Sequence, residues 1–229
     1  MGEDTVKPMN TKKNGTAVAS TSQELLDRKP PPAVEALAEA CVKFVERALG
    51  VRLDYCPETL PVLDHYLEQA RSAMVDRIEA VPVVAQAAGA YLGEVVRRRH
   101  ASWWRAQGDD ATDWQIEFEA VYLAWKPVLF IQEALLRDRH GEPQGEPHGS
   151  AGGASEGDAA AFVLQDDDRE AVAARLAELP SVSDAEYYAP STRIEVIDIV
   201  VEAIRARRMA QGEELDDALE PADYEQSED

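Results

Sequence analysis

The chain of 229 residues is long enough for one domain of ordinary size with flexible additions, or at most two small ones. Its hydrophobic fraction of 45% and charged fraction of 29% are those of a globular protein, so a packed core is expected. The net charge of −21 argues against a sequence-independent grip on DNA or RNA, because phosphate binding needs clustered Lys and Arg. A more basic protein is the natural charged partner.

Two further features bear on location. The two cysteines, Cys41 and Cys56, lack metal-ligand spacing, which favours a reducing cytoplasm. Residues 1–10 lack the basic and then apolar pattern of a signal peptide, and no apolar run reaches the ~20 residues that span a bilayer. We therefore expect a soluble cytoplasmic protein with no membrane contact.

Helices are predicted in the first part of the chain. Residues 1–32 are rich in Thr, Ser, Lys, Asn and Pro, and we expect a disordered lead-in there. Apolar residues then repeat at three and four from Val34 to Ala48, and Gly50 stands where a left-handed helix stop is expected. Two more helices are expected to begin at Pro57 and at Pro82, because proline is harmless in a first helical turn.

A small sheet is predicted between residues 103 and 125. This stretch holds all four tryptophans, Trp103, Trp104, Trp114 and Trp125. Trp114, Ile116 and Phe118 alternate with Gln115, Glu117 and Glu119, which is the period-two pattern of a half-buried strand. Segments 103–106 and 121–125 flank that strand, and a helix is expected from Pro127. The predicted fold is a single α+β domain over residues 33–210, with a three-stranded antiparallel sheet packed by about five or six helices.

The last third of the chain begins with a loop. Residues 139–160 contain six glycines and two prolines and are predicted to be flexible. A short strand at 162–164, a helix at 166–179 and a helix at 191–209 follow, the last with a broad apolar face and a capping box at Thr192 and Glu195. Residues 211–229 hold nine acids and no Lys or Arg, and are expected to be a disordered acidic tail.

One segment resembles a known family. The run Gly89-Ala90-Tyr91-Leu92-Gly93-Glu94-Val95-Val96-Arg97-Arg98 resembles a G-x-Y-L-G-E-V-x-R-R helix of uncharacterised bacterial proteins, where it precedes a tryptophan-bearing strand, two more strands and a helix. Asp54-Tyr55-Cys56-Pro57-Glu58 resembles the Asp-Tyr-Ser-Pro-Glu that opens an earlier helix there, with Cys56 in place of serine. The resemblance covers residues 50–138. It implies an α+β fold and carries over no activity or catalytic residue.

The clearest candidate surface combines arginine and tryptophan. Its members are Arg97, Arg98, Trp103, Trp104, Trp114 and Trp125. One interpretation is a pocket for an acidic group or a nucleobase, which would use stacking and charge. The other, which we favour, is a helix end followed by a core strand. Gly89 and Gly93, on the preceding helix, indicate tight helix-to-sheet packing rather than a membrane motif.

No pattern in the sequence specifies catalysis, a metal or a cofactor. The histidines His65, His100, His140 and His148 lack metal spacing, and the aspartates at 109, 110, 113 and 166–168 fit a polar turn and a helix start. Cys56 and His65 have no third group to position them as nucleophile and base. There is no Gly-x-Ser-x-Gly elbow and no phosphate loop.

We therefore expect a non-enzymatic, acidic module that binds a basic protein, as an inhibitor or an immunity protein does. Two alternatives stay open. One is an enzyme that uses Glu117 or Glu119 as acid or base beside the tryptophans. The other is a structural protein that assembles symmetrically through the 191–209 helix.

Overall fold

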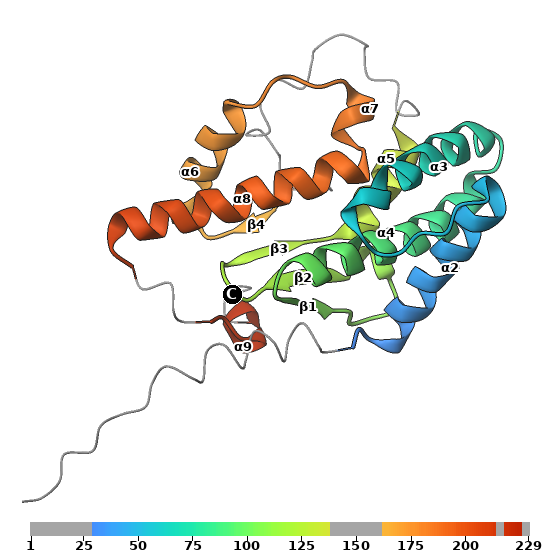
Figure 1. Ribbon diagram of the computed structural model, residues 1–229. Coiled ribbons are helices and arrows are strands. Elements are labelled where there is room, and N and C mark those ends of the chain that lie inside the picture. The colour runs from blue at the N-terminus through green and yellow to red at the C-terminus, as the bar shows by residue number, and fades with distance from the viewer. Residues whose placement is uncertain (1–28, 138–161, 214–217, 226–229) are drawn as a thin grey trace, which may run out of the picture.

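The computed structural model describes residues 29–137, 162–213 and 218–225, and these form an α+β protein (Figure 1). The described ranges contain eight α-helices and one four-stranded antiparallel sheet. The predicted class is confirmed, although the sheet has one strand more than expected. The loop predicted at 139–160 and residues 1–28 of the lead-in lie outside the described residues. None of the described helices combines the length and the apolar character needed to cross a bilayer.

Proline lies in the first turn of each of the first three helices. Pro82 does so as predicted, whereas Pro57, which was expected to open a helix, begins a 3₁₀ turn. Helix α2 (Pro32–Leu49), helix α3 (Leu60–Ala73) and helix α4 (Val81–Arg99) each carry proline at one of the first two positions. One 3₁₀ turn, η1 (Pro57–Thr59), precedes α3. Helix α2 ends at Leu49 and is capped by Gly50, whose φ of 69° is left-handed and suits glycine.

Helix α4 lies at the centre of the molecule and packs against α2 and against α5 (Pro127–Leu136). Its two glycines permit close approach. A Cβ at Gly89 would lie 2.5 Å from the Cα of Val128 in α5, and a Cβ at Gly93 would lie 2.3 Å from the Trp104 ring. The pair therefore serves tight packing, with Gly93 against the sheet as predicted and Gly89 against a helix.

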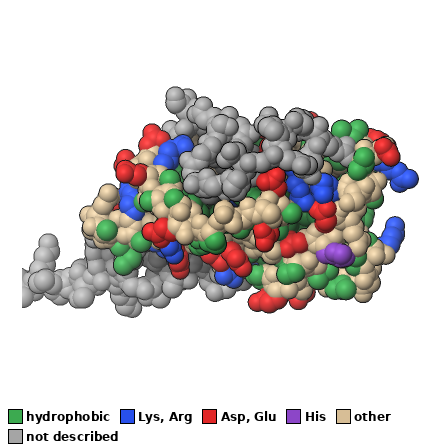
Figure 2. Space-filling model, turned by 90° about the horizontal axis from the view of Figure 1, so that it is seen from above, with side chains coloured by type: hydrophobic (Ala, Val, Ile, Leu, Met, Phe, Trp, Pro, Cys, Tyr) green, Lys and Arg blue, Asp and Glu red, His purple; other side chains and the backbone are tan. Residues whose placement is uncertain are grey.

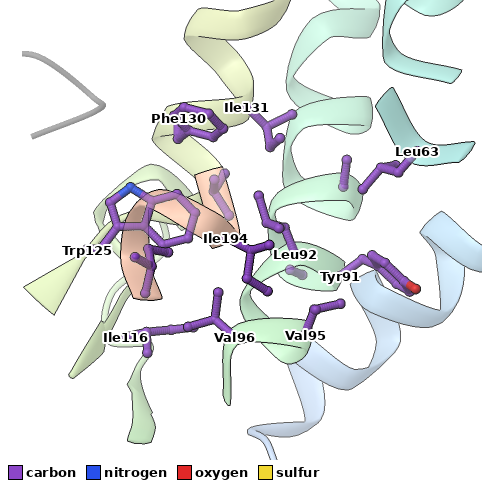
Figure 3. Packing of buried hydrophobic residues seen from close by; sticks show 14 of the residues in the cluster. Leu63, Tyr91, Leu92, Val95, Val96, Ile116, Trp125, Phe130, Ile131 and Ile194 are labelled. Atoms are coloured by element: carbon purple, nitrogen blue, oxygen red, sulfur yellow. The ribbon is translucent and has the colours of Figure 1, made fainter. Parts of the chain in front are cut away.

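A contiguous apolar core runs from Val34 to Ile204. Figure 3 shows side chains of α4 meeting the sheet and α8 (Pro190–Gln211), with Leu92, Val96 and Ile194 close together. The apolar face predicted for α8 is buried against other parts of this chain. The feature that suggested symmetric assembly is thus covered from within the molecule.

The strand order is β1-β2-β3-β4, and all neighbours are antiparallel. The bounds are β1 (Ser102–Arg105), β2 (Gln115–Phe118), β3 (Leu123–Trp125) and β4 (Val163–Leu164). The short strand expected at 162–164 therefore joins this sheet, where Leu164 pairs with Leu123. Within the described residues, β1 is an edge strand.

The prediction that β2 is only half-buried is wrong. Glu117 and Glu119, expected to face water, are 1% and 3% exposed. A second apolar cluster, formed by Trp103, Tyr122, Ala124 and Tyr224, lies on that side of the sheet. Tyr224 belongs to helix α9 (Pro221–Glu225). The prediction of a disordered tail over 211–229 is therefore wrong for residues 218–225, because a buried aromatic side chain fixes this segment to the sheet.

The start of α8 also differs from expectation. The capping box predicted at Thr192 and Glu195 does not form, because the helix begins at Pro190 and Thr192 lies inside it. Asp64 of α3 accepts a hydrogen bond from the Ser191 N–H instead, at 3.2 Å. This contact ties α3 to the first turn of α8.

Two helices precede α8. Helix α6 (Asp166–Ala177) begins with the three aspartates, as predicted, and packs against α8. Asp168 is buried there, with its Oδ1 3.2 Å from the Arg207 Nε. Helix α7 (Asp184–Tyr187) opens with a reciprocal capping box formed by Ser183 and Glu186.

Candidate binding groove at the edge of the sheet

A groove of about 510 Å³ lies beside β1, which is an edge strand among the described residues. Residues of β1 line its floor, Pro30–Pro32 form one wall, and Pro221 and Glu225 of α9 form the other. Figure 1 shows the start of α2 and helix α9 at the same border of the sheet, next to β1. The volume falls in the range of roughly 300–1,000 Å³ that is typical of ligand sites.

Two neighbouring tryptophans point to opposite faces of β1, as successive strand residues do. The Trp103 Nε1–H donates to Glu117 Oε2 at 2.7 Å, and the Trp104 Nε1–H donates to Glu94 Oε1 at 2.8 Å. The two residues are 5% and 8% exposed. The two residues are therefore core side chains that also line the groove, which agrees with the interpretation favoured from the sequence.

On the α4 side of the strand, Glu94 holds a buried ion pair. Arg97 Nε donates to Glu94 Oε1 at 2.8 Å, and Arg97 Nη2 donates to Oε2 at 3.0 Å. Both side chains are almost fully buried. The bidentate geometry offsets the cost of burying two charged side chains.

On the other side, Glu117 accepts bonds from three side chains. In addition to Trp103, Gln115 Nε2 donates to Glu117 Oε1 at 2.8 Å, and Arg105 Nη1 donates to the same oxygen at 3.4 Å. The two arginines that line the groove, Arg97 and Arg105, thus each face a buried carboxylate.

The two walls of the groove differ in the sign of the exposed charges along their outer border, which we call the rim. Lys29 is exposed on the proline wall, and Glu225 is exposed on the α9 wall. Glu220 and Asp223 are exposed on the same short segment, and residues 218–225 contain no Lys or Arg. The α9 wall is therefore the acidic side of the groove.

The Tyr224 hydroxyl fastens the α9 wall to the end of the β2–β3 hairpin. It accepts hydrogen bonds from the N–H groups of Phe118 and Leu123, both at 3.1 Å, and the Phe118 carbonyl lies 2.7 Å away as its nearest acceptor. Burial raises the pKa of Tyr224 far above its ordinary value, because a phenolate would be desolvated there. The hydroxyl therefore remains a neutral donor.

The Tyr224 ring is equally well held. It stacks on Tyr122 with centroids 4.4 Å apart and meets the edge of Trp103 at 5.7 Å. The Leu219 N–H donates to the Glu119 carbonyl at 2.9 Å. The segment before the helix is thus also bonded to the sheet.

The six residues of the predicted surface do not form one site. Three of them line the groove: Arg97, Trp103 and Trp104. Arg98 lies over the Tyr55 ring, with its Cζ 3.9 Å from the centroid. The other two are elsewhere in the core: Trp125 packs on Phe130, and Trp114 donates to the Gly108 carbonyl.

Sequence reasoning missed both walls. The sequence predicts a disordered lead-in at Pro30–Pro32 and a disordered tail at Pro221 and Glu225. The tail did carry a signal, because Tyr224 is a lone aromatic residue among acids, three residues after a proline that suits a first helical turn.

The described histidines contact other side chains. His100 Nε2 lies 2.9 Å from Asp198 Oδ1, and His65 Nε2 lies 2.8 Å from Gln69 Nε2. His140 and His148 lie outside the described residues. In the part of the chain that the structure describes, no three His, Cys, Asp or Glu side chains gather in a way that could hold a metal ion.

The cysteines differ in their surroundings. Cys41 is buried in the core, and burial raises the pKa of its thiol to about 12. Cys56 is exposed, and its Sγ lies 3.9 Å from the Asp54 carbonyl oxygen. The pKa of Cys56 is raised, first by desolvation and then by the nearby carboxylates, so its thiol is the dominant form at neutral pH.

The helix segment that resembles a bacterial family has a packing explanation. Gly89 and Gly93 admit α5 and Trp104, as described above, and Glu94 binds the Trp104 indole. The Tyr91 hydroxyl accepts a hydrogen bond from the Tyr55 N–H at 2.9 Å, where Tyr55 has a left-handed φ of 64°. Among these residues, Trp104 lines the groove, and the others pack α4 against its neighbours.

Comparison with known protein families, with curated proteins and with solved structures finds no match. The functional argument therefore depends on the chemistry of the groove.

Proposed function

We propose that the protein is a non-enzymatic module that binds a segment of a more basic protein in the groove along β1. The observation that carries the proposal is the groove itself, about 510 Å³ between the proline wall and α9. This hollow unites segments that are far apart in the sequence, residues 29–32, 102–107 and 221–225, around an edge strand of the described sheet.

The lining favours a polypeptide ligand. Its apolar part consists of prolines, Ala106 and the edges of Trp103 and Trp104. Tryptophan and arginine are the side chains that most often dominate binding energy at protein interfaces. A few polar groups, among them Ser102 and Gln107, can fix the orientation of a bound segment.

The charge distribution favours a basic partner. The net charge is −21, and the α9 wall adds exposed acids at the groove. By contrast, on the described part of the face in Figure 2, acidic and basic side chains are interspersed. An acidic rim steers a basic partner toward the groove and raises the encounter rate.

The way in which Glu117 is held favours binding over catalysis. It lines the groove, which is the observation on which an enzymatic alternative would rest. However, its oxygens accept bonds from an indole, an amide and a guanidinium. Such a carboxylate belongs to a structural hydrogen-bond network, in which protein donors already occupy both of its oxygens.

Capture of a partner from the native cell tests the proposal. The full chain is immobilised at low salt beside two charge-reversal variants. One reverses the rim, Glu220→Lys with Glu225→Lys. The other is a matched control, Glu46→Lys with Glu79→Lys, at exposed positions that do not line the groove.

We expect a basic protein to be retained by the wild type and by the control, and to be lost from the rim variant. Failure of the wild type to retain any protein, or equal retention by all three chains, would refute the proposal.

A further inference from the structure

We propose that the partner segment binds as an added β-strand, paired with the free edge of β1. This inference rests on the proposed function and concerns how the ligand is recognised. Strand addition at a sheet edge uses backbone hydrogen bonds for affinity and alternate side chains for specificity.

The hydrogen-bonding pattern between β1 and β2 shows which backbone groups of β1 could bond to an added strand. The Glu119 N–H donates to the Ala101 carbonyl at 3.0 Å, and these two residues lie opposite each other in the β1–β2 register. In an antiparallel pair, hydrogen-bonded and non-bonded positions alternate. Trp103 and Arg105 therefore turn their N–H and C=O groups toward β2, whereas Ser102 and Trp104 turn theirs outward.

The outward groups lie at the groove. Ser102 and Trp104 both line it, and no other described residue bonds to their backbone N–H or C=O. Two such residues offer two donors and two acceptors, spaced as in a strand. A bound strand would satisfy all four groups, which is the condition that buried backbone groups meet in stable proteins.

The facing wall cannot complete the sheet. It consists of Pro30, Pro31 and Pro32, and proline has no backbone N–H to donate. Proline near an exposed edge also protects against uncontrolled strand pairing. Here the prolines and β1 line the same hollow of about 510 Å³, so the prolines border the strand without pairing with it.

The walls also predict the side chains of that segment. Successive side chains of a strand point to opposite faces of the sheet. The side chains that point toward α9, where Glu225 is exposed, would be basic. Those on the other face would point to the side of Trp104 and would be apolar, since the Arg97 charge there is already matched by Glu94. The ligand class is an extended segment in which basic and apolar residues alternate.

The probes for the test are eight-residue synthetic peptides in which lysine alternates with an apolar residue. Each is made in three forms: unmodified, N-methylated at odd positions, and N-methylated at even positions. N-methylation removes the backbone donor without changing the side chains. Binding to the full chain is measured by titration, and hydrogen exchange of the Ser102 and Trp104 amides is followed by NMR.

We expect the unmodified peptides to bind and to slow exchange of both amides at least ten-fold. One N-methyl register should weaken binding ten-fold or more, while the other, whose methyl groups point away from β1, should not. Ala106→Trp, which fills the groove, should abolish binding. Ala36→Trp is the matched control, since Ala36 is exposed on α2 and does not line the groove.

The outcomes separate the two proposals. If the peptides bind, Ala106→Trp blocks them, and both N-methyl forms bind as well as the parent, the groove is a binding site and strand addition is wrong. If neither a cellular partner nor any peptide binds the wild type, the proposed function fails and the inference fails with it.

Discussion

At the scale of single residues, two carboxylates determine the geometry of β1. Glu94 and Glu117 lie on opposite faces of the strand, and each accepts a hydrogen bond from one indole and one arginine. The neighbouring tryptophans are therefore held from both sides. A change that moves either indole should alter the floor of the groove.

Gly93→Ala tests the packing behind Trp104. The new methyl group would lie 2.3 Å from the ring, so the indole must move and its bond to Glu94 must lengthen. We expect a loss of roughly 1–3 kcal/mol in the free energy of unfolding. Urea titration measures it, and the Trp104 Nε1–H resonance reports the movement.

Gly50→Ala is the control for this change. It introduces the same methyl group into open space, at a left-handed φ of 69°. It should lower stability by about 1–2 kcal/mol through backbone strain while the indole resonance stays in place. An unmoved resonance in Gly93→Ala would contradict the packing argument.

Tyr224→Phe tests the anchor of α9. The change keeps the ring and removes the hydroxyl that bonds to the backbone of Phe118 and Leu123. Leaving buried N–H groups without an acceptor costs about 1–3 kcal/mol. We expect a stability loss of this size and faster hydrogen exchange at the Leu123 amide.

Tyr66→Phe is the matched control for the anchor, because the Tyr66 hydroxyl bonds to no other described residue. This variant should leave the free energy of unfolding and the exchange rate of the Leu123 amide nearly unchanged. If the two variants behave alike, the hydroxyl does not fasten the segment.

At the scale of elements, helices α4 and α8 are joined by side chains at the end of α4. Arg99 donates two hydrogen bonds to Asp198, at 2.8 and 2.7 Å, and His100 lies 2.9 Å from the same carboxylate. Burial lowers the pKa of His100 below its ordinary 6.5, although Asp198 acts in the opposite direction. The folded protein therefore binds a proton at His100 less readily than the unfolded chain does.

This difference predicts how stability depends on pH. As pH falls through about 6.5, the unfolded chain takes up a proton at His100 before the folded protein does, so the free energy of unfolding falls. Below the folded pKa the effect levels off. We expect His100→Gln to reduce the stability difference between pH 7.5 and pH 5.5, measured by urea titration.

His65→Gln is the control, since His65 is exposed on α3. It should keep the wild-type pH dependence. An unchanged pH dependence in His100→Gln would show that burial of this imidazole has no part in it.

The elements that the sequence predicts are those with local causes. Helix α2 is predicted from its apolar repeat and Gly50, both of which act within one helix length. Strand β4 has two residues and forms by pairing with β3, about forty positions earlier in the chain. Helix α9 has five residues and depends on Tyr224 contacts with residues 101 to 106 positions away. No local pattern encodes such pairings.

The same distinction explains the candidate site. Arg97, Trp103 and Trp104 lie close together in sequence, so a cluster is predicted there, and these three do line the groove. The walls come from residues 30–32 and 221–225, which only the folded chain brings together. Trp114 and Trp125 share only their residue type with the groove tryptophans, because their rings contact the Gly108 carbonyl and Phe130.

At the scale of the whole molecule, the charge predicts how association depends on salt. A net charge of −21 attracts a basic partner over several ångströms, and ions screen this attraction beyond about 10 Å at 0.1 M salt. We expect the association rate with the captured partner to fall roughly ten-fold or more between low and physiological ionic strength.

The dissociation rate should change much less, because the contacts inside the groove are short-ranged. Stopped-flow mixing at several NaCl concentrations measures both rates. An association rate that is independent of salt would contradict electrostatic steering.

The contacts of Tyr224 also impose an order on folding. The β2–β3 hairpin is synthesised before α9. The Tyr224 hydroxyl, which bonds to the backbone at the open end of the hairpin, lies 101 to 106 residues later in the chain. A chain that is still being translated can thus build its central helices while one side of the sheet remains uncovered. The groove gains its acidic wall only after residues 218–225 have left the ribosome, so the hollow beside β1 forms later than the sheet that it borders.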